Sequence, residues 1–141
     1  MPLKLSLKPG EKIIINGAVV ANGQHKTELV LQNRASVLRQ RDIVTEDWAT
    51  TPARQLYYLL QLMYLFPEGD DRRTPALKKL LLEFASAAPS AVPLLFTVSQ
   101  NAADGKLYEA LQGCKKLITH EDKIFEIGKG PKGKGEARPS R

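Results

Sequence analysis

The sequence predicts an α+β protein, in which an N-terminal antiparallel β meander, or small barrel-like sheet, precedes about four helices and a disordered basic tail. Two observations lead to this class. Short apolar runs alternate with turn signals through residue 44, whereas apolar residues recur at helical spacing after Trp48. We expect an antiparallel β unit at 1–48, a helical unit packed on it at 49–127, and a Gly/Lys-rich tail at 128–141.

The β unit opens with Leu3–Leu7, where leucines alternate with polar residues as in a strand with one buried face. Three dipeptides then mark turns: Pro9-Gly10, Asn16-Gly17 and Asn22-Gly23. Pro-Gly suits a type II turn. Asn-Gly favours the type I′ turn of a tight hairpin, because both central residues need positive φ. The segments between these turns are therefore predicted to form the remaining strands of a meander.

A further strand is predicted from about Ser36 to Val44. Its period of two would place Arg39 and Arg41 on the same side, where two guanidiniums can engage successive phosphates. In the alternative, these arginines form ion pairs on a solvated face, which is the commoner position of charged strand residues. The candidate acidic partners are Glu28, Asp42 and Glu46.

Proline in the first turn predicts three helix starts. Thr51-Pro52 and Thr74-Pro75 supply the first two, and Ser90 is expected to cap a third helix with Pro93 in its first turn. Gly105 separates this helix from a fourth, whose apolar face carries Leu107, Leu111, Cys114 and Ile118. Residues 121–127 either extend the fourth helix or fray from it.

The first helix is apolar nearly all round between Leu56 and Phe66. Such a helix is either the central element of a bundle, which is the commoner case, or part of a partner interface. Trp48 is expected to pack where the β and helical units join. The candidate partner-binding residues lie on this helix: Tyr57, Tyr58, Leu62, Tyr64 and Leu65.

No catalytic constellation stands out, so we expect a binding protein rather than an enzyme, with no cofactor. His25 and His120 have no further ligands at metal-binding spacing, so no metal site is expected. The single cysteine, Cys114, is expected to be buried and structural, in a cytoplasmic chain. The longest apolar run is far shorter than the roughly 18 residues of a membrane span, and no secretory leader is recognised.

The formal charge of +6 is unevenly distributed. Residues 128–141 hold five basic side chains against one acidic, so the body is only weakly basic. This tail approaches a phosphate-loop spacing, but it has Gly135 where a Ser or Thr is needed. Its composition predicts disorder, and net charge alone does not support tight nonspecific binding of nucleic acid.

Several separated blocks resemble the FlbT family, the flagellar biosynthesis repressors of alphaproteobacteria. They are Leu3–Lys12, Ile13–Val19, Leu31–Ala35, Arg41-Asp42-Ile43 and Leu62–Leu65. The resemblance runs from Met1 to about Ile127, and the tail looks like a variable extension. It implies association with the 5′ leader of flagellin mRNA and promotion of its degradation, although some members act positively. It also implies a small flagellin-associated secretion partner, and it carries over no catalytic residue.

A second resemblance, to the carbon storage regulator family of RNA-binding β proteins, covers the first third of the chain. It rests on Leu3–Leu7, Gly10-Glu11 and Arg41-Asp42-Ile43. It implies that Lys4 and Arg41 lie near an RNA surface. Edge strands could then pair between two copies of the chain, which leaves a homo-oligomer open.

Two function hypotheses follow. In the first, a post-transcriptional repressor contacts the flagellin mRNA leader through basic residues of the β unit: Lys4, Lys8, Lys12, Arg39 and Arg41. In the alternative, a chaperone-like adaptor binds flagellin or its secretion partner through the helices and affects mRNA only indirectly. Arginines held in ion pairs would favour the adaptor.

Overall fold

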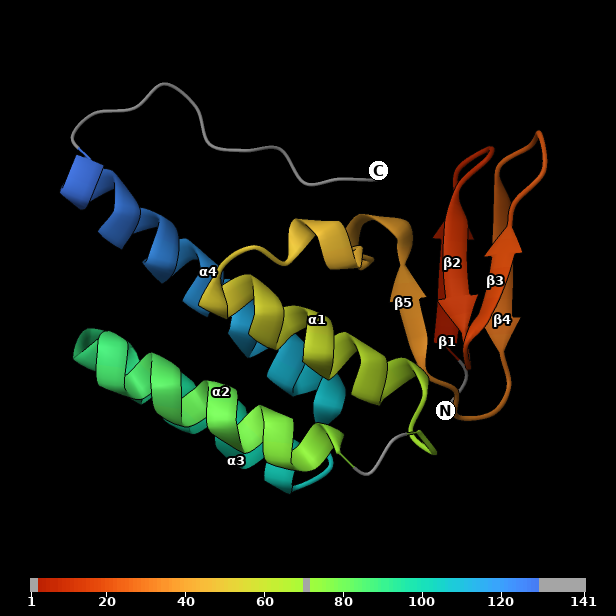
Figure 1. Ribbon diagram of the computed structural model, residues 1–141. Coiled ribbons are helices and arrows are strands. Elements are labelled where there is room, and N and C mark those ends of the chain that lie inside the picture. The colour runs from red at the N-terminus through yellow and green to blue at the C-terminus, as the bar shows by residue number, and fades with distance from the viewer. Residues whose placement is uncertain (1–2, 70–71, 130–141) are drawn as a thin grey trace.

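The computed structural model describes residues 3–69 and 72–129, with side chains described through residue 125. It confirms the α+β class, because antiparallel strands are followed by four helices in the described part of the chain. The β unit lies at one end of the helices (Figure 1). Residues 128 and 129 belong to the last helix, and the rest of the predicted tail lies outside the described residues.

The strands form two small sheets. β1 (Leu3–Leu7) pairs antiparallel with β4 (Thr27–Leu31), and β2 (Lys12–Ile15) lies between β3 (Ala18–Ala21) and β5 (Val37–Arg39). The predicted hairpin between β2 and β3 is confirmed, since Asn16 and Gly17 have φ values of 50° and 85°. The simple meander is wrong, because β1 pairs with β4 rather than with β2.

Two turns explain this pairing. Glu11 N donates to Lys8 O at 3.0 Å and Gly10 has φ 74°, as in the predicted type II turn, but the turn carries the chain from one sheet to the other. Asn22 does not form a tight hairpin turn. Its side-chain amide donates instead to Lys8 O at 2.8 Å and to His25 O at 2.9 Å, so the chain after β3 is held against the end of β1.

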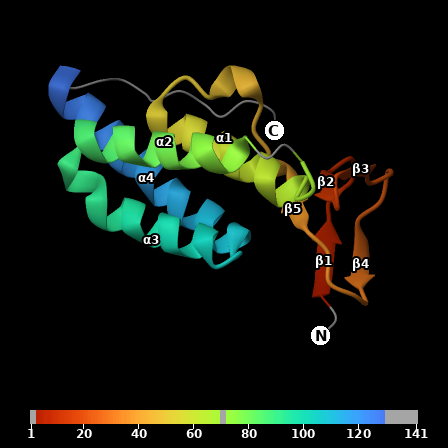
Figure 2. The same ribbon diagram turned by 60° about the horizontal axis from the view of Figure 1, so that its bottom comes forward.

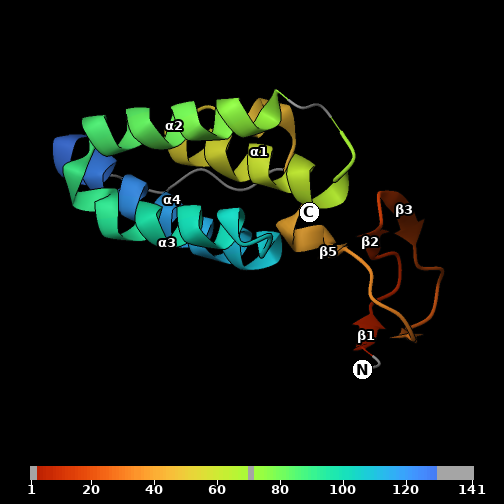
Figure 3. The same ribbon diagram turned by 90° about the horizontal axis from the view of Figure 1, so that it is seen from below.

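The period of two in β2 and β5 gives the molecule a layered core. Ile13 and Val37 face the β1–β4 sheet, where they join Leu5 and Leu7 in a small core. Leu38 joins the main core, which lies among the helices. The β3-β2-β5 sheet therefore separates the β1–β4 sheet from the helical unit (Figure 3).

The helices form two layers, with α1 (Pro52–Leu65) and α2 (Arg73–Ala87) over α3 (Val92–Ala103) and α4 (Leu107–Lys129) (Figures 2 and 3). α1 is the central helix that its composition favoured, since Leu56 and Leu60 are fully buried in the main core. Trp48 is buried as well, with its ring 5.8 Å from that of Tyr57 on α1.

Of the three predicted helix caps, the structure confirms the one at Thr51. Thr51 caps α1, because its hydroxyl accepts a hydrogen bond from Arg54 N at 3.3 Å. The start predicted at Thr74-Pro75 is wrong in detail, since α2 begins at Arg73 with Arg72 in the cap position, and Thr74 and Pro75 lie inside its first turn. The cap predicted at Ser90 is wrong, since that residue lies in a 3-10 turn before α3 and Ala91 occupies the cap position. Residues 121–127 extend α4.

Among the described helices, none taken alone is long and apolar enough to cross a membrane. α2 and Pro89–Ala103 meet that length and composition only together, as a pair bent by 120°.

Three polar side chains of α1, at i, i+4 and i+7, bind the backbone of residues 37–44. Tyr57 Oη donates to Asp42 O at 2.7 Å. Gln61 accepts from Val44 N and donates to Val44 O, both at 2.9 Å. Tyr64 Oη accepts from Val37 N at 2.9 Å and donates to Val37 O at 3.0 Å. We call Tyr57, Gln61 and Tyr64 the α1 ladder.

The α1 ladder explains why the strand predicted from Ser36 to Val44 is wrong beyond residue 39. A short 3-10 turn, Gln40–Asp42, follows β5. Backbone groups that a longer strand would pair with a neighbour are bound here by helix side chains. Arg39 and Arg41 therefore do not share one face of a strand.

We predict that Gln61→Ala lowers the free energy of unfolding by about 2–4 kcal/mol, because it leaves the buried N–H and C=O of Val44 without partners. Urea unfolding followed by circular dichroism measures the change. Gln55→Ala, at an exposed position of the same helix, is the matched control and is expected to stay close to the parent chain. Equal stability of the two variants would contradict a structural role for the Gln61 amide.

Candidate nucleic-acid interface

An open groove of about 610 Å³ lies where the end of β1 meets the turn after β5. Four basic residues line it: Lys8, Lys26, Arg39 and Arg41. The end of β1 at Ser6 and Leu7, the Pro9-Gly10-Glu11 turn and Gln40 complete its wall. We call this feature the basic groove. It brings together basic residues that lie up to 33 positions apart in the chain, through the two turns described above.

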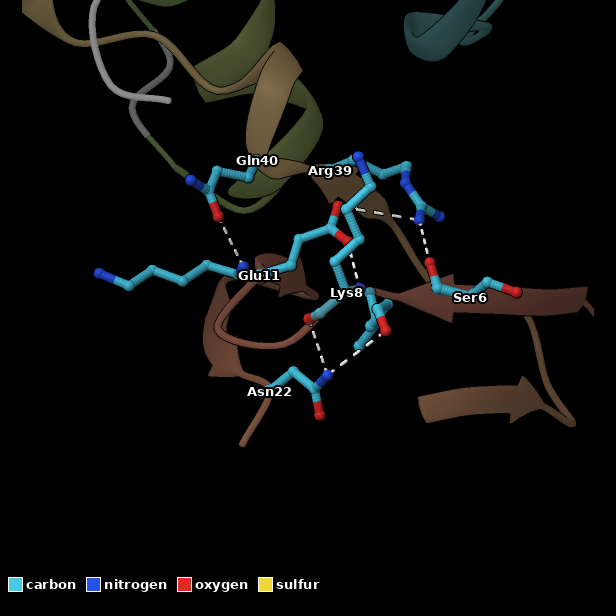
Figure 4. Close-up of polar contacts among 8 residues, drawn as sticks. Ser6, Lys8, Glu11, Asn22, Arg39 and Gln40 are labelled. Atoms are coloured by element: carbon cyan, nitrogen blue, oxygen red, sulfur yellow. Dashed lines mark hydrogen bonds and ion pairs between the residues drawn. The ribbon is translucent and has the colours of Figure 1, made fainter. Parts of the chain in front are cut away.

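Arg39, on β5, is held inside the basic groove by contacts with β1 and with the turn that precedes β2 (Figure 4). Its Nη2 donates to the backbone oxygen of Ser6 on β1 and lies 3.8 Å from Glu11 Oε2. Glu11 Oε1 also accepts a hydrogen bond from Lys8 N at 2.9 Å. The ion-pair alternative therefore applies to Arg39, although its partner is Glu11 rather than Glu28, Asp42 or Glu46.

The other predicted RNA-binding residues are exposed but not all are brought together. Lys8 and Arg41 line the basic groove, whereas Lys4 and Lys12 are outside its lining. Lys4 lies on β1 opposite Val30 of β4. The backbone N–H of Lys12 donates to Gln40 Oε1 at 2.7 Å, which holds β2 to the turn after β5.

Lys26 was missed in the sequence analysis. It follows the loop after Asn22-Gly23, and a simple meander gives no reason to place that loop near Lys8. The Asn22 amide, which binds Lys8 O, brings the two segments together. An Asn that bridges distant backbone groups cannot be distinguished by sequence from one that forms a hairpin turn.

The β unit is more cationic than the chain as a whole. Residues 1–45 contain seven basic side chains against three acidic ones. Two of the three acids are engaged, since Glu11 contacts Arg39 and Asp42 Oδ1 accepts from Lys115 Nζ of α4 at 2.6 Å. The positive charge that remains on this surface can attract phosphates.

The predicted partner-binding residues lie mostly inside the protein. Tyr57 and Leu65 are only 2% and 4% exposed, and Tyr64 binds Val37 through its hydroxyl. Tyr58 and Leu62 are half-buried. Most of the apolar surface of α1 is therefore buried in the main core and does not face a partner. Exposed apolar surface lies elsewhere, including a groove of about 310 Å³ lined by Leu80, Phe84, Ile124 and Phe125.

Cys114, on α4, is buried in the main core, with Sγ 3.5 Å from Ala53 O. Burial, with a smaller contribution from the charge of Glu121, strongly raises the pKa of its thiol. Glu121 is itself buried and caps α1, because it accepts from Ala53 N at 3.0 Å and from Thr51 Oγ1 at 2.5 Å.

Among the described residues, no group of three His, Cys, Asp or Glu side chains could hold a metal ion.

Comparisons with known proteins all point to one family. A family model described as "Flagellar protein FlbT" matches residues 3–125. The "Flagellum biosynthesis repressor protein FlbT" of Caulobacter vibrioides (strain ATCC 19089 / CIP 103742 / CB 15) is 42% identical over 140 residues, which cover 97% of this chain and 99% of that protein. The "Probable flagellum biosynthesis repressor protein FlbT" of Caulobacter sp. (strain K31) is 45% identical over 86% of this chain and 95% of its own length. No solved structure matches.

We predict that Cys114 resists alkylation in the folded protein. The thiolate is the reactive form, and a raised pKa keeps the thiol protonated at pH 8. Iodoacetamide at that pH is expected to leave the native mass unchanged and to add one label in urea, as measured by intact mass spectrometry. Complete labelling of the native chain at the rate of the unfolded chain would contradict this assignment.

Proposed function

Because this chain belongs to the FlbT family, we propose that it represses flagellum biosynthesis by associating with the 5′ leader of flagellin mRNA and promoting degradation of that message. The C. vibrioides relative is named a flagellum biosynthesis repressor, and this chain covers nearly its whole length. In this proposal cellular nucleases cleave the message in the cytoplasm, and the protein changes their access to the leader.

The observation that carries the proposal is the basic groove. Lys8, Lys26 and Arg41 are exposed there, each just outside a strand: Lys8 follows β1, Lys26 precedes β4, and Arg41 lies in the short turn after β5. Phosphate contacts of this kind supply affinity that falls with salt, without reading sequence. A groove of this size suits a single strand, whose phosphates can follow the curved wall.

Arg39 has a different part in this proposal. Its guanidinium already binds Ser6 O and lies next to Glu11, so its first role is to join the sheets. The Glu11 carboxylate occupies a position that a phosphate oxygen would otherwise favour beside Arg39. Glu11 is therefore expected to oppose RNA binding in the basic groove rather than to contribute to it.

A second candidate function, the flagellin adaptor, draws support from the Arg39–Glu11 ion pair and from the groove at Leu80, Phe84, Ile124 and Phe125, here called the apolar groove, rather than from the buried face of α1. Ile124 at that groove is 36% exposed, among apolar neighbours from α2 and α4. Apolar helix grooves are a common means of binding amphipathic segments of a partner.

We predict that Lys8→Gln with Lys26→Gln weakens binding to a flagellin 5′ leader RNA and lowers the slope of log affinity against log salt by roughly 1.4, about 0.7 for each lost contact to a single strand. Filter binding over a salt series measures both quantities. Glu11→Gln is expected to change affinity in the opposite direction, because it removes a negative charge from the basic groove.

Lys78→Gln with Lys79→Gln is the matched control, because it removes the same charge from exposed positions on α2. Equal losses in this control and in the groove variant would show attraction by net charge alone. Absence of leader binding by the parent chain would refute direct contact with the message.

The adaptor predicts that flagellin is retained by the immobilised chain after ribonuclease treatment of the lysate, and that Ile124→Ser reduces this retention. Leu82→Ser is the control, at a site that is 71% exposed and outside the apolar groove. Immunoblotting for flagellin gives the readout. Complete loss of flagellin on ribonuclease treatment would count against the adaptor.

A further inference from the structure

A second concave surface lies between the β unit and the helical unit. It has a volume of about 660 Å³, and its lining comes from the Asn16 turn, the residues 34–36 before β5, the end of α1 and the start of α4. The start of α4 lies next to β5 in Figure 3. We call this surface the tyrosine crease, because Tyr64 and Tyr108 line it together.

Tyr108 is an exposed ring with a rigid support. It is 42% exposed, and its centroid lies 5.9 Å from that of Tyr64 with the planes inclined at 48°. Tyr64 is held by both backbone groups of Val37 through its hydroxyl. An aromatic side chain with an accessible surface and an immobilised neighbour can stack on a planar ligand with little loss of conformational freedom.

The charge around this ring favours an anionic ligand. Arg34 and Lys106 line the tyrosine crease and are exposed, and Glu109 is the acidic residue of the lining. Asn16 and Ser36 add polar groups, and Asn16 Oδ1 accepts from Ser36 N at 2.9 Å. Basic side chains beside an accessible aromatic ring are the combination that proteins use to bind single-stranded nucleic acid.

We propose that the tyrosine crease binds an unpaired base of single-stranded RNA, which stacks on Tyr108 while Arg34 and Lys106 contact the flanking phosphates. This inference rests on the proposed function and assigns the base contact to a site separate from the basic groove. The basic groove lies near the Glu11 end of β2 and the tyrosine crease near the Asn16 end. The four residues of β2 span roughly 13 Å, which a short single strand can cover.

The test compares Tyr108→Leu with Tyr108→Phe in filter binding of a flagellin 5′ leader RNA. Loss of the ring is expected to weaken binding about tenfold, whereas Phe, which keeps the stacking surface, is expected to stay within about twofold of the parent chain. The salt slope should be unchanged in both, because neither variant removes a charge. Phe96→Leu, at a site on α3 that is 63% exposed, is the control for loss of a surface aromatic.

Three outcomes decide the inference. Parent-like binding by Tyr108→Leu, while Lys8→Gln with Lys26→Gln is weakened, overturns the base subsite and leaves the proposed function standing. No leader binding by the parent chain overturns both. If Tyr108→Leu is unfolded by circular dichroism, Arg34→Gln decides: a salt slope lower by about 0.7 supports the tyrosine crease, and an unchanged slope and affinity overturn it.

Discussion

The structure depends on the hydrogen bonds that the α1 ladder makes with the backbone of residues 37–44. Leu38 and Val44 of this segment are buried in the main core, and the segment pairs with a strand on one side only, so its other buried polar groups need partners. Tyr57, Gln61 and Tyr64 provide them from one face of a helix. Lys115 of α4 adds a contact to Asp42. The direction of β5, and with it the position of the β3-β2-β5 sheet on the helices, follows from these bonds.

Charge in the β unit has a structural role and, in the proposed function, a role in binding phosphates. Arg39 joins β5 to β1 through the backbone oxygen of Ser6. It also pairs with Glu11 of the connecting turn, and the partial exposure of both side chains makes the net contribution of this ion pair to stability small. The neighbouring Lys8 is held in place by its backbone: its N–H donates to Glu11 and its C=O accepts from the Asn22 amide. Its side chain is therefore not needed to hold this wall together. The same wall thus holds the link from Arg39 to β1 and the exposed Lys8 and Lys26, which contact phosphates in the proposed function.

Local sequence signals predicted what depends on local geometry. The type I′ turn at Asn16-Gly17, the type II turn at Pro9-Gly10 and the cap at Thr51 all follow from neighbouring residues. The pairing of β1 with β4 and the early end of β5 were not predictable in this way. They depend on Asn22 binding Lys8 O and on Gln61 binding Val44, contacts that join separate segments. Lys26 and Tyr108 carry no local signal for the same reason, since each acquires its neighbours only in the folded chain.

The layered core has a consequence for how the molecule opens. The β1–β4 sheet closes over a core of its own, built on Leu5, Leu7 and Ile13, and this core is separate from the one among the helices. So small an apolar cluster stabilises its sheet far less than the helical core stabilises the bundle. Amide hydrogens of this outer ribbon should therefore exchange with solvent through a partial opening in which the helices stay folded. Such an opening would move Lys8 and Lys26, which flank this sheet, relative to Arg39 and Arg41 without global unfolding.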